Sequence, residues 1–127
     1  MLTADQNRLL TEIGPGSRMG ALMRRYWHPV AGRDELSDKA TLRVRILGED
    51  LVLFKDKAGK YGLIGEACPH RRASMAMGIP TNEGLRCAYH GWLIDHGGHC
   101  IDQPFEGERH ALRGKKAVPA YPVKELG

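Results

Sequence analysis

The chain has 127 residues, of which 42% are hydrophobic and 27% charged, with 19 Lys and Arg against 15 Asp and Glu. This length and composition favour one folded domain and exclude an intrinsically disordered chain. No apolar run approaches the roughly 20 residues of a membrane-spanning helix, and no signal peptide is visible, so we expect a cytoplasmic protein with no membrane partner.

The formal net charge of +4 is spread along the chain. Basic residues occur as pairs such as Arg24 and Arg25 or Lys115 and Lys116, with acidic residues between the pairs. A nucleic-acid site needs a clustered basic footprint, so we expect no nucleic-acid partner.

Residues 1–30 are predicted to form a helical extension. Thr3 with Gln6 matches a capping box, and Gly14-Pro15-Gly16 ends this first helix. Ser17 can cap a second helix that Pro29 stops. Its apolar residues recur at helical spacing and form one stripe, which we interpret as a packing surface: Met19, Leu22, Met23, Tyr26 and Trp27.

From Thr41 the hydrophobic period changes from helical spacing to two, which is typical of a half-buried strand. Gly48-Glu49-Asp50 predicts a turn, and residues 51–55 and 61–64 predict two further strands joined by a loop.

A second hairpin is expected from residues 92–95 and 99–102. Residues 103–116 are interpreted as a surface loop, and residues 117–125 as an extended segment whose prolines suit an edge strand. The body of the chain is therefore predicted to be antiparallel β-structure.

Two short motifs combine Cys with His: Cys68-Pro69-His70, and Cys87-Ala88-Tyr89-His90. Each follows a strand-like run and begins a loop that contains Gly or Pro. Two such loops at one end of a sheet would bring two thiolates and two imidazoles together, where irregular backbone can supply amides to sulfur.

Two metal chemistries use two Cys and two His. A structural zinc site prefers like ligands paired along the chain. Mixed Cys/His pairs are typical of a Rieske [2Fe-2S] centre, in which two thiolates hold one iron and two imidazoles hold the other. The mixed pairing favours the cluster, with a zinc-binding structural module as an alternative.

With these motifs, the chain resembles the Rieske iron-sulfur proteins, and within them the aromatic-ring oxygenases of the phthalate dioxygenase type. The sequence segments that resemble the family are GPG and MRRYWHPV near the N-terminus, then CPHRRAS, LRCAYHGW and GGHCIDQP. The resemblance implies a Rieske-type antiparallel β-sandwich with cluster-binding loops over residues 31–127.

The resemblance also implies roles for particular residues. Cys68 and Cys87 would bind the inner iron, and His70 and His90 the outer, solvent-nearer iron. Trp92 would pack against the loops. Backbone amides that would hydrogen-bond the cluster sulfurs are those near Arg71, Arg72, Tyr89, Gly91 and Trp92.

The respiratory branch of the family has an extra Cys in each loop, joined by a disulfide, where this chain has Ala73 and Tyr89. Its hydroxyl donors to the cluster are replaced here by Trp92 and Ile94. Without those donors we predict a midpoint potential below about 0 mV. Many members have Gly where this chain has Arg72, so Arg would be strained if that position needs a positive φ.

The remaining Cys and His residues are not expected to bind metal. Cys100 is interpreted as a small buried apolar residue. No Cys or carboxylate partner at ligand spacing is evident for His28, His96, His99 and His110.

An oxygenase of this type would also need a catalytic domain with a mononuclear iron held by two His and one carboxylate. Nothing after Cys100 supplies those ligands, so we expect the closing strand and the catalytic domain to lie outside these residues.

The resemblance then implies an electron-transfer domain that takes single electrons from a flavin/iron-sulfur reductase or ferredoxin. It would pass them to an iron that hydroxylates an aromatic substrate, within a possible homotrimer. A free-standing Rieske ferredoxin is the alternative, although the N-terminal helical stretch favours an oxygenase.

Overall fold

The computed structural model describes residues 1–107 and 112–126. The helices and strands of these residues are α1 Ala4–Thr11, α2 Arg18–Met23, β1 Thr41–Ile46, β2 Glu49–Lys55, β3 Tyr61–Gly65, β4 Ile79–Pro80, β5 Leu85–Arg86, β6 Leu93–Ile94, β7 Cys100–Asp102 and β8 Ala120–Tyr121. Short 3₁₀ turns occur at Arg33–Leu36 and Met75–Met77.

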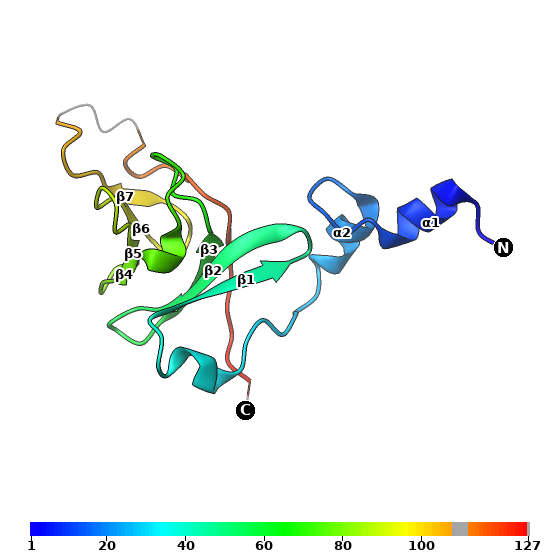
Figure 1. Ribbon diagram of the computed structural model, residues 1–127, viewed down its shortest axis with the longest axis horizontal. Coiled ribbons are helices and arrows are strands. Elements are labelled where there is room, and N and C mark those ends of the chain that lie inside the picture. Colours follow the sequence, from blue (N-terminus) through cyan, green and yellow to red (C-terminus); the bar gives the residue numbers. More distant parts are fainter. Residues whose placement is uncertain (108–111, 127) are drawn as a thin grey trace.

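The strands form two antiparallel sheets, with the orders β1-β2-β3-β8 and β4-β5-β6-β7 (Figure 1). One hydrophobic core joins them, with Phe54 and Ile64 from the first sheet and Leu85 and Ile94 from the second. The predicted mainly β, antiparallel sandwich is therefore confirmed.

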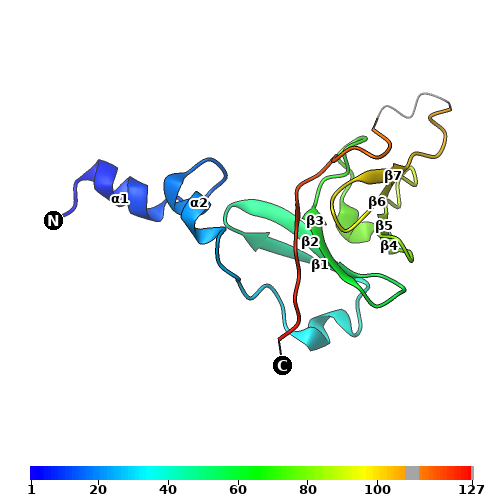
Figure 2. The same cartoon turned by 180° about the vertical axis from the view of Figure 1, so that it is seen from behind.

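The central strand β2 is buried on both faces. Its residues Leu51 to Phe54 are all buried, because Val52 and Phe54 face the main core while Leu51 and Leu53 face a second cluster. That second cluster includes Val123 of the C-terminal segment, which runs beside β3 in Figure 2. A continuous apolar run in a strand is what burial on both faces requires.

The first hairpin turns earlier than predicted. Ile46 pairs with Glu49, so the turn consists of Leu47 and Gly48 and not of residues 48–50. Both have positive φ, 49° and 76°, as a two-residue type I′ turn requires. Gly48 indicated a turn in the sequence, whereas leucine is an unusual residue for a positive φ.

The helical extension is only partly as predicted. The capping box of α1 is confirmed, since Gln6 N donates to Thr3 Oγ1 at 3.2 Å and Thr3 N donates to Gln6 Oε1 at 2.9 Å. The prediction that the second helix reaches Pro29 was wrong, because α2 ends at Met23.

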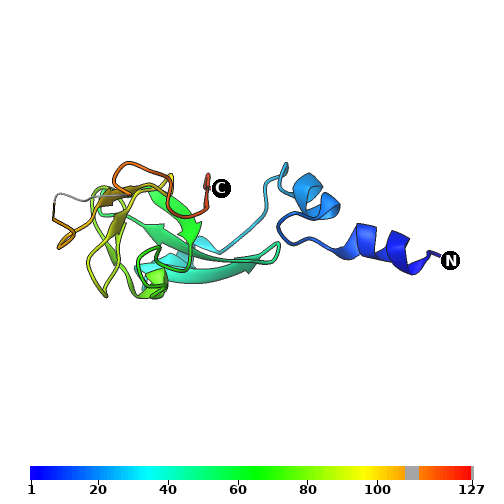
Figure 3. The ribbon, with the colours of Figure 1, turned by 90° about the horizontal axis from the view of Figure 1, so that it is seen from above.

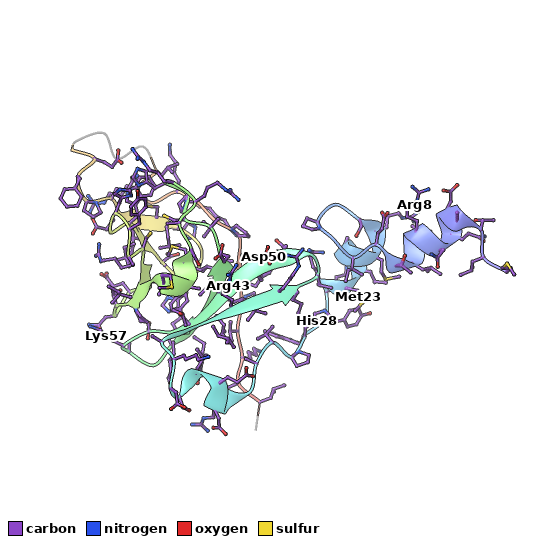
Figure 4. All side chains as sticks on the ribbon, in the orientation of Figure 1. Arg8, Met23, His28, Arg43, Asp50 and Lys57 are labelled. Atoms are coloured by element: carbon purple, nitrogen blue, oxygen red, sulfur yellow. The ribbon has the colours of Figure 1, made fainter. Side chains whose placement is uncertain are left out.

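Most of the apolar stripe of that extension is exposed among the described residues, although Met19 and Met23 are half-buried. Tyr26 and Trp27 are 65% and 57% exposed. None of the residues of α1 is buried, and the two helices form an arm that extends away from the sandwich (Figure 3). Arg8 lies far out on this arm, while Met23 and His28 mark its junction with the sheet (Figure 4).

The chain after the second loop forms shorter strands than predicted. Strand β6 excludes Trp92 and Asp95, and β8 is confined to Ala120 and Tyr121. As expected for an edge strand, β8 lies at the border of its sheet between Pro119 and Pro122. Among the described residues, no helix is long and apolar enough to cross a bilayer.

Candidate metal centre

The two Cys/His motifs lie on two loops of the same length and architecture. The first loop runs from Cys68 to Ala73, and its flanking residues Ala67 and Ser74 form an antiparallel bridge. The second runs from Cys87 to Trp92, flanked by the Arg86 and Leu93 pair that joins β5 to β6. Each loop is thus the tip of a small hairpin.

The main chain closes both loops in the same way. Cys68 N donates to Ala73 O at 2.9 Å and Arg72 N donates to Cys68 O at 2.8 Å. The corresponding bonds of the second loop are Cys87 N to Trp92 O at 2.8 Å and Gly91 N to Cys87 O at 3.0 Å.

The fifth residue of each loop, Arg72 or Gly91, has a positive φ of 57° or 76°. The strain expected at Arg72 if this position needs a positive φ is therefore present. Because the backbones match, each loop places its Cys at the base and its His nearer the tip.

Both thiols lie in the hydrophobic core. Cys68 and Cys87 are 2% and 3% exposed, and both belong to the cluster of side chains between the sheets. Burial raises the pKa of the Cys68 thiol to about 11, and the adjacent Cys87 adds to this, while the main-chain amides of His70 and Arg71 oppose it. Two buried thiols side by side become thiolates most readily when a metal replaces their protons.

The two imidazoles meet near the surface. The ring centroids of His70 and His90 are 4.7 Å apart in an edge-to-face arrangement. The Nδ1 atom of His70 is buried and has no hydrogen-bond partner among the described residues, whereas its Nε2 lies 3.9 Å from Glu106 Oε1. A buried ring nitrogen without a partner fits a metal ligand, since a lone pair left unbonded inside the protein is costly.

The environment of His90 favours the neutral form of its ring. Desolvation, together with the positive charges of His70 and Arg71, lowers the pKa of His90 below its usual value. A neutral imidazole has the lone pair that metal coordination needs.

Two aromatic side chains border the histidines. Trp92 is buried and stacks on His70 with ring centroids 4.7 Å apart and planes only 5° apart. Tyr89 is exposed and its ring centroid lies 3.8 Å from that of His90. These rings restrict how far either imidazole can rotate.

The amides expected near the cluster sulfurs fall into three groups. Those of Arg72 and Gly91 already donate to the carbonyls of their own loops. The Arg71 amide lies near the Cys68 sulfur. The amides of Tyr89 and Trp92 make no hydrogen bond to any described residue.

The donor set fits a two-iron cluster better than one zinc ion. Each loop pairs one Cys with one His, and the two thiols are buried while the two rings are half-buried. A closed zinc site needs four ligands around one point, whereas a [2Fe-2S] cluster needs two thiolates at one iron and two imidazoles at the other. The cluster would accordingly sit between the two loop tips.

The other cysteine and histidines lie elsewhere. Cys100 is fully buried and not in a disulfide, as predicted for a packing residue. His28 Nε2 lies 2.8 Å from the Met23 carbonyl. His110 lies outside the described residues.

Two of these histidines do have carboxylate neighbours, which sequence spacing did not suggest. His96 Nε2 lies 3.1 Å from Oδ2 of the buried Asp56, which comes from the loop after β2. His99 Nδ1 lies 3.2 Å from Asp95 Oδ1 across a turn.

One side chain that supports the second loop was missed. Arg86 Nη1 donates to Gly91 O at 2.6 Å and to Asp102 Oδ2 at 2.9 Å. Nothing local in the sequence links these three positions, because the contact depends on the pairing of β5, β6 and β7.

Comparisons with known proteins agree with this geometry. Residues 26–122 match the Rieske [2Fe-2S] domain family. The chain is 52% identical over 130 residues to the 5,5'-dehydrodivanillate O-demethylase oxygenase subunit of a Sphingobium species, covering 100% of this chain and 31% of the relative. It is 41% identical over 129 residues to the phthalate 4,5-dioxygenase oxygenase subunit of Pseudomonas putida, covering 100% of this chain and 29% of the relative.

A solved structure shares the fold. NdmA of Pseudomonas putida CBB5 superposes with a TM-score of 0.71 and 31% identity, over 84% of this chain and 33% of NdmA. The chain spans about a third of the length of the curated relatives it matches. With its paired Cys/His loops, its β-sandwich and these matches, the chain belongs to the Rieske [2Fe-2S] domain family, whose cofactor is a [2Fe-2S] cluster.

Proposed function

We propose that this chain is the electron-transfer domain of a Rieske non-haem iron oxygenase. The observation that carries the proposal is the division between buried thiols and half-buried imidazoles on two matching loops. When bound, the [2Fe-2S] cluster supplies one-electron redox chemistry at this place. The surface imidazoles then offer the shortest path for an electron between the cluster and a partner.

The ligand set of the proposal is Cys68 and Cys87 at the inner iron, and His70 and His90 at the outer iron. The buried position of both thiols and the unpartnered Nδ1 of His70 support this assignment. Amides near Arg71, Tyr89 and Trp92 remain candidates to donate to the cluster sulfurs.

The electron donor of the proposal is a flavin/iron-sulfur reductase or a ferredoxin. The exposed Arg71 and Arg72 lie beside the histidines, and complementary charge would speed the encounter with an acidic donor. The acceptor is a mononuclear-iron catalytic domain outside these 127 residues, in an assembly that we propose to be a homotrimer.

The reaction class of the proposal is oxygenation in aromatic catabolism in the cytoplasm. It is supported by relatives that are named as oxygenase subunits for a divanillate and for phthalate, and by three cysteines that form no disulfide. The N-terminal arm with its exposed apolar residues supports the oxygenase over a free-standing ferredoxin, because a small carrier has no need of it.

Anaerobic reconstitution with iron and sulfide tests the cluster. We expect a red-brown protein that dithionite bleaches and that then shows an EPR signal of a reduced [2Fe-2S] centre. A protein that stays colourless and binds zinc instead would contradict the proposal.

Two buried cysteines make a matched pair of variants for this experiment. Cys87→Ala should abolish the visible absorption, while Cys100→Ala should retain it, because Cys100 belongs to β7 and to neither of the two loops. Equal loss in both variants would refute the ligand assignment.

The midpoint potential and the gene test the oxygenase role. A potential below about 0 mV is expected, since Trp92 and Ile94 stand where the respiratory branch has its hydroxyl donors. A clearly positive potential would contradict it. The reading frame that encodes the chain should also continue past Gly127 into a domain with two His and one carboxylate.

A further inference from the structure

The second ligand loop has a support that the first loop lacks. We infer that Arg86, anchored by Asp102, is a positioning residue that sets the peptide plane between Gly91 and Trp92 beside the cluster. The inference rests on the proposed cluster site.

The contacts of Arg86 define this role. Its Nη1 atom donates both to Gly91 O at 2.6 Å and to Asp102 Oδ2 at 2.9 Å. Arg86 immediately precedes the ligand Cys87 at the end of β5, and Asp102 ends β7. One guanidinium nitrogen thus ties the ligand loop to the far edge of its sheet, and charge-assisted hydrogen bonds of this length are among the stronger ones in proteins.

The peptide that Arg86 holds is the one that ends in the Trp92 amide. A trans peptide is planar, and its C=O and N–H groups point in opposite directions. Fixing the Gly91 carbonyl therefore fixes the direction of the Trp92 N–H. That amide makes no hydrogen bond to a described residue, so it is available to the cluster.

Gly91 itself does little to fix the orientation of the peptide between Gly91 and Trp92. Gly91 has a φ of 76°, and glycine moves more freely through such conformations than other residues. A Cβ at Gly91 would lie 3.0 Å from Pro104 Cγ and 4.0 Å from Arg86 Nη1, so both side chains lie next to this residue. The hydrogen bond from Arg86 to the Gly91 carbonyl therefore restricts the backbone freedom of Gly91.

The first loop has no side chain that corresponds to that of Arg86. Ala67 occupies the position that Arg86 has in the second loop, and no side chain there can reach the fifth-residue carbonyl. At that fifth position stands Arg72, whose side chain restricts its own backbone in a way that Gly91 cannot.

Arg86 is expected to raise the midpoint potential of the cluster. The cationic guanidinium at the carbonyl end polarises the peptide and strengthens its N–H as a donor to sulfur. Both that donor and the positive charge stabilise the reduced, more negative cluster. Losing Arg86 should therefore lower the midpoint potential.

Three measurements on the reconstituted chain test the inference: the EPR g-values of the reduced cluster, its midpoint potential, and the rate of cluster loss to a chelator. Arg86→Met should shift the g-values, lower the potential and speed cluster loss about tenfold, as is typical when a support of a ligand is removed. Arg86→Lys, which keeps the charge and N–H donors, should restore most of each property.

Asp102→Asn serves where Arg86→Met does not fold. It keeps the Arg86 charge but weakens its anchor, so it should speed cluster loss to a smaller extent. The matched control is Arg45→Met, because Arg45 pairs with Asp50 at 3.1 Å in the β1-β2 hairpin, away from the loops.

A folded Arg86→Met with wild-type g-values, potential and loss rate would overturn the inference, as would equal changes in Arg45→Met. Unaltered cluster loss in Asp102→Asn would also count against it. If the wild-type chain assembles no [2Fe-2S] cluster, both the proposed function and this inference are overturned. If it assembles a cluster that Arg86→Met leaves unchanged, only this inference is overturned.

Discussion

Arg72 stands in a backbone conformation that L-residues with side chains adopt at a cost. Its φ is 57°, and its amide closes the first loop on the Cys68 carbonyl at 2.8 Å. The corresponding residue of the second loop is Gly91, for which the same conformation is easily reached. The loop geometry is thus retained even where the residue does not favour it.

Replacing Arg72 by glycine should stabilise the protein. We expect Arg72→Gly to raise the free energy of unfolding by about 1 kcal/mol, because the left-handed conformation costs a non-glycine residue roughly that much. Urea unfolding measures the change. Arg71→Gly is the control, since Arg71 lacks a positive φ and should lose stability on the same substitution. A stabilised Arg71→Gly with no gain in Arg72→Gly would contradict the role of φ.

His70 tests the ligand set directly. We expect His70→Cys to retain a cluster and to lower its midpoint potential toward the roughly −400 mV of all-thiolate clusters, because a thiolate adds negative charge. Redox titration with optical detection measures it. His99→Cys is the control, since His99 pairs with Asp95 away from the loops and should leave the potential unchanged. A raised potential in His70→Cys would refute the assignment.

At the scale of elements, one polar network joins the arm to the sandwich. Arg24, just after α2, donates to Glu49 Oε2 of β2 at 2.9 Å, and Tyr121 of β8 donates to the same carboxylate oxygen at 2.6 Å. Arg24 also donates to the carbonyls of Ile13 and Leu47. Three elements distant in sequence therefore meet at one carboxylate.

This network should make stability depend on alkaline pH. Burial, together with the hydrogen bond to Glu49, raises the pKa of Tyr121 above its usual value. A raised folded-state pKa means that the stabilisation is complete below the unfolded value of about 10 and is lost as pH rises through the folded value. We expect the stability advantage of wild type over Tyr121→Phe to be complete below about pH 10 and to decrease as the pH rises above it.

Urea unfolding of both proteins from pH 8 upward measures the difference. Tyr61→Phe is a suitable control, because Tyr61 lies at the start of β3 without a bond to Glu49. A difference between wild type and Tyr121→Phe that stays constant with pH would contradict the expectation.

Local pattern predicted some elements well and others only in part. The alternation after Thr41 identified β1, because side chains of a strand alternate between faces whatever the sheet contains. The helical stripe that includes Trp27 predicted too long a second helix. Helical spacing alone could not show that α2 ends at Met23 and that His28 reaches back to its carbonyl.

For the whole molecule, helix α1 is separable from the sandwich in its contacts. Helix α1 has no buried residue and contacts mainly α2, while the cluster loops lie at the opposite side of the sandwich (Figure 1). The assignment of residues 31–127 to the cluster domain stays a prediction that this separation makes testable.

Removing residues 1–12 should leave the cluster unaffected. This deletion keeps Gly14, whose Cα lies close to Gly48 at the β1-β2 turn. We expect the midpoint potential and EPR spectrum of the reconstituted protein to be unchanged, and the melting temperature to shift by no more than about 2 °C, because surface changes cost about 0.5 kcal/mol at most. An altered EPR spectrum would show that the arm supports the loops.

The ligand set stays a prediction, and it could be made from the sequence because its residues lie in two short segments. Each motif holds one soft thiolate and one imidazole within four residues of the chain, and this mixed pairing is typical of a two-iron cluster. The antiparallel β-structure followed from the local alternation of apolar residues, and the Rieske-type sandwich from the resemblance to the family. No distant contact had to be known for either conclusion.

The support of the site could be decided only by the tertiary structure. Whether Arg86 meets Asp102, or His96 meets Asp56, depends on the register of strands and on loops that are far apart in sequence. The sequence by itself determined the ligand set that we propose, because both Cys/His motifs lie within short segments of the chain. The packing of two sheets decided how those atoms are held, because hydrogen bonds between distant segments form only once the backbone brings them within reach.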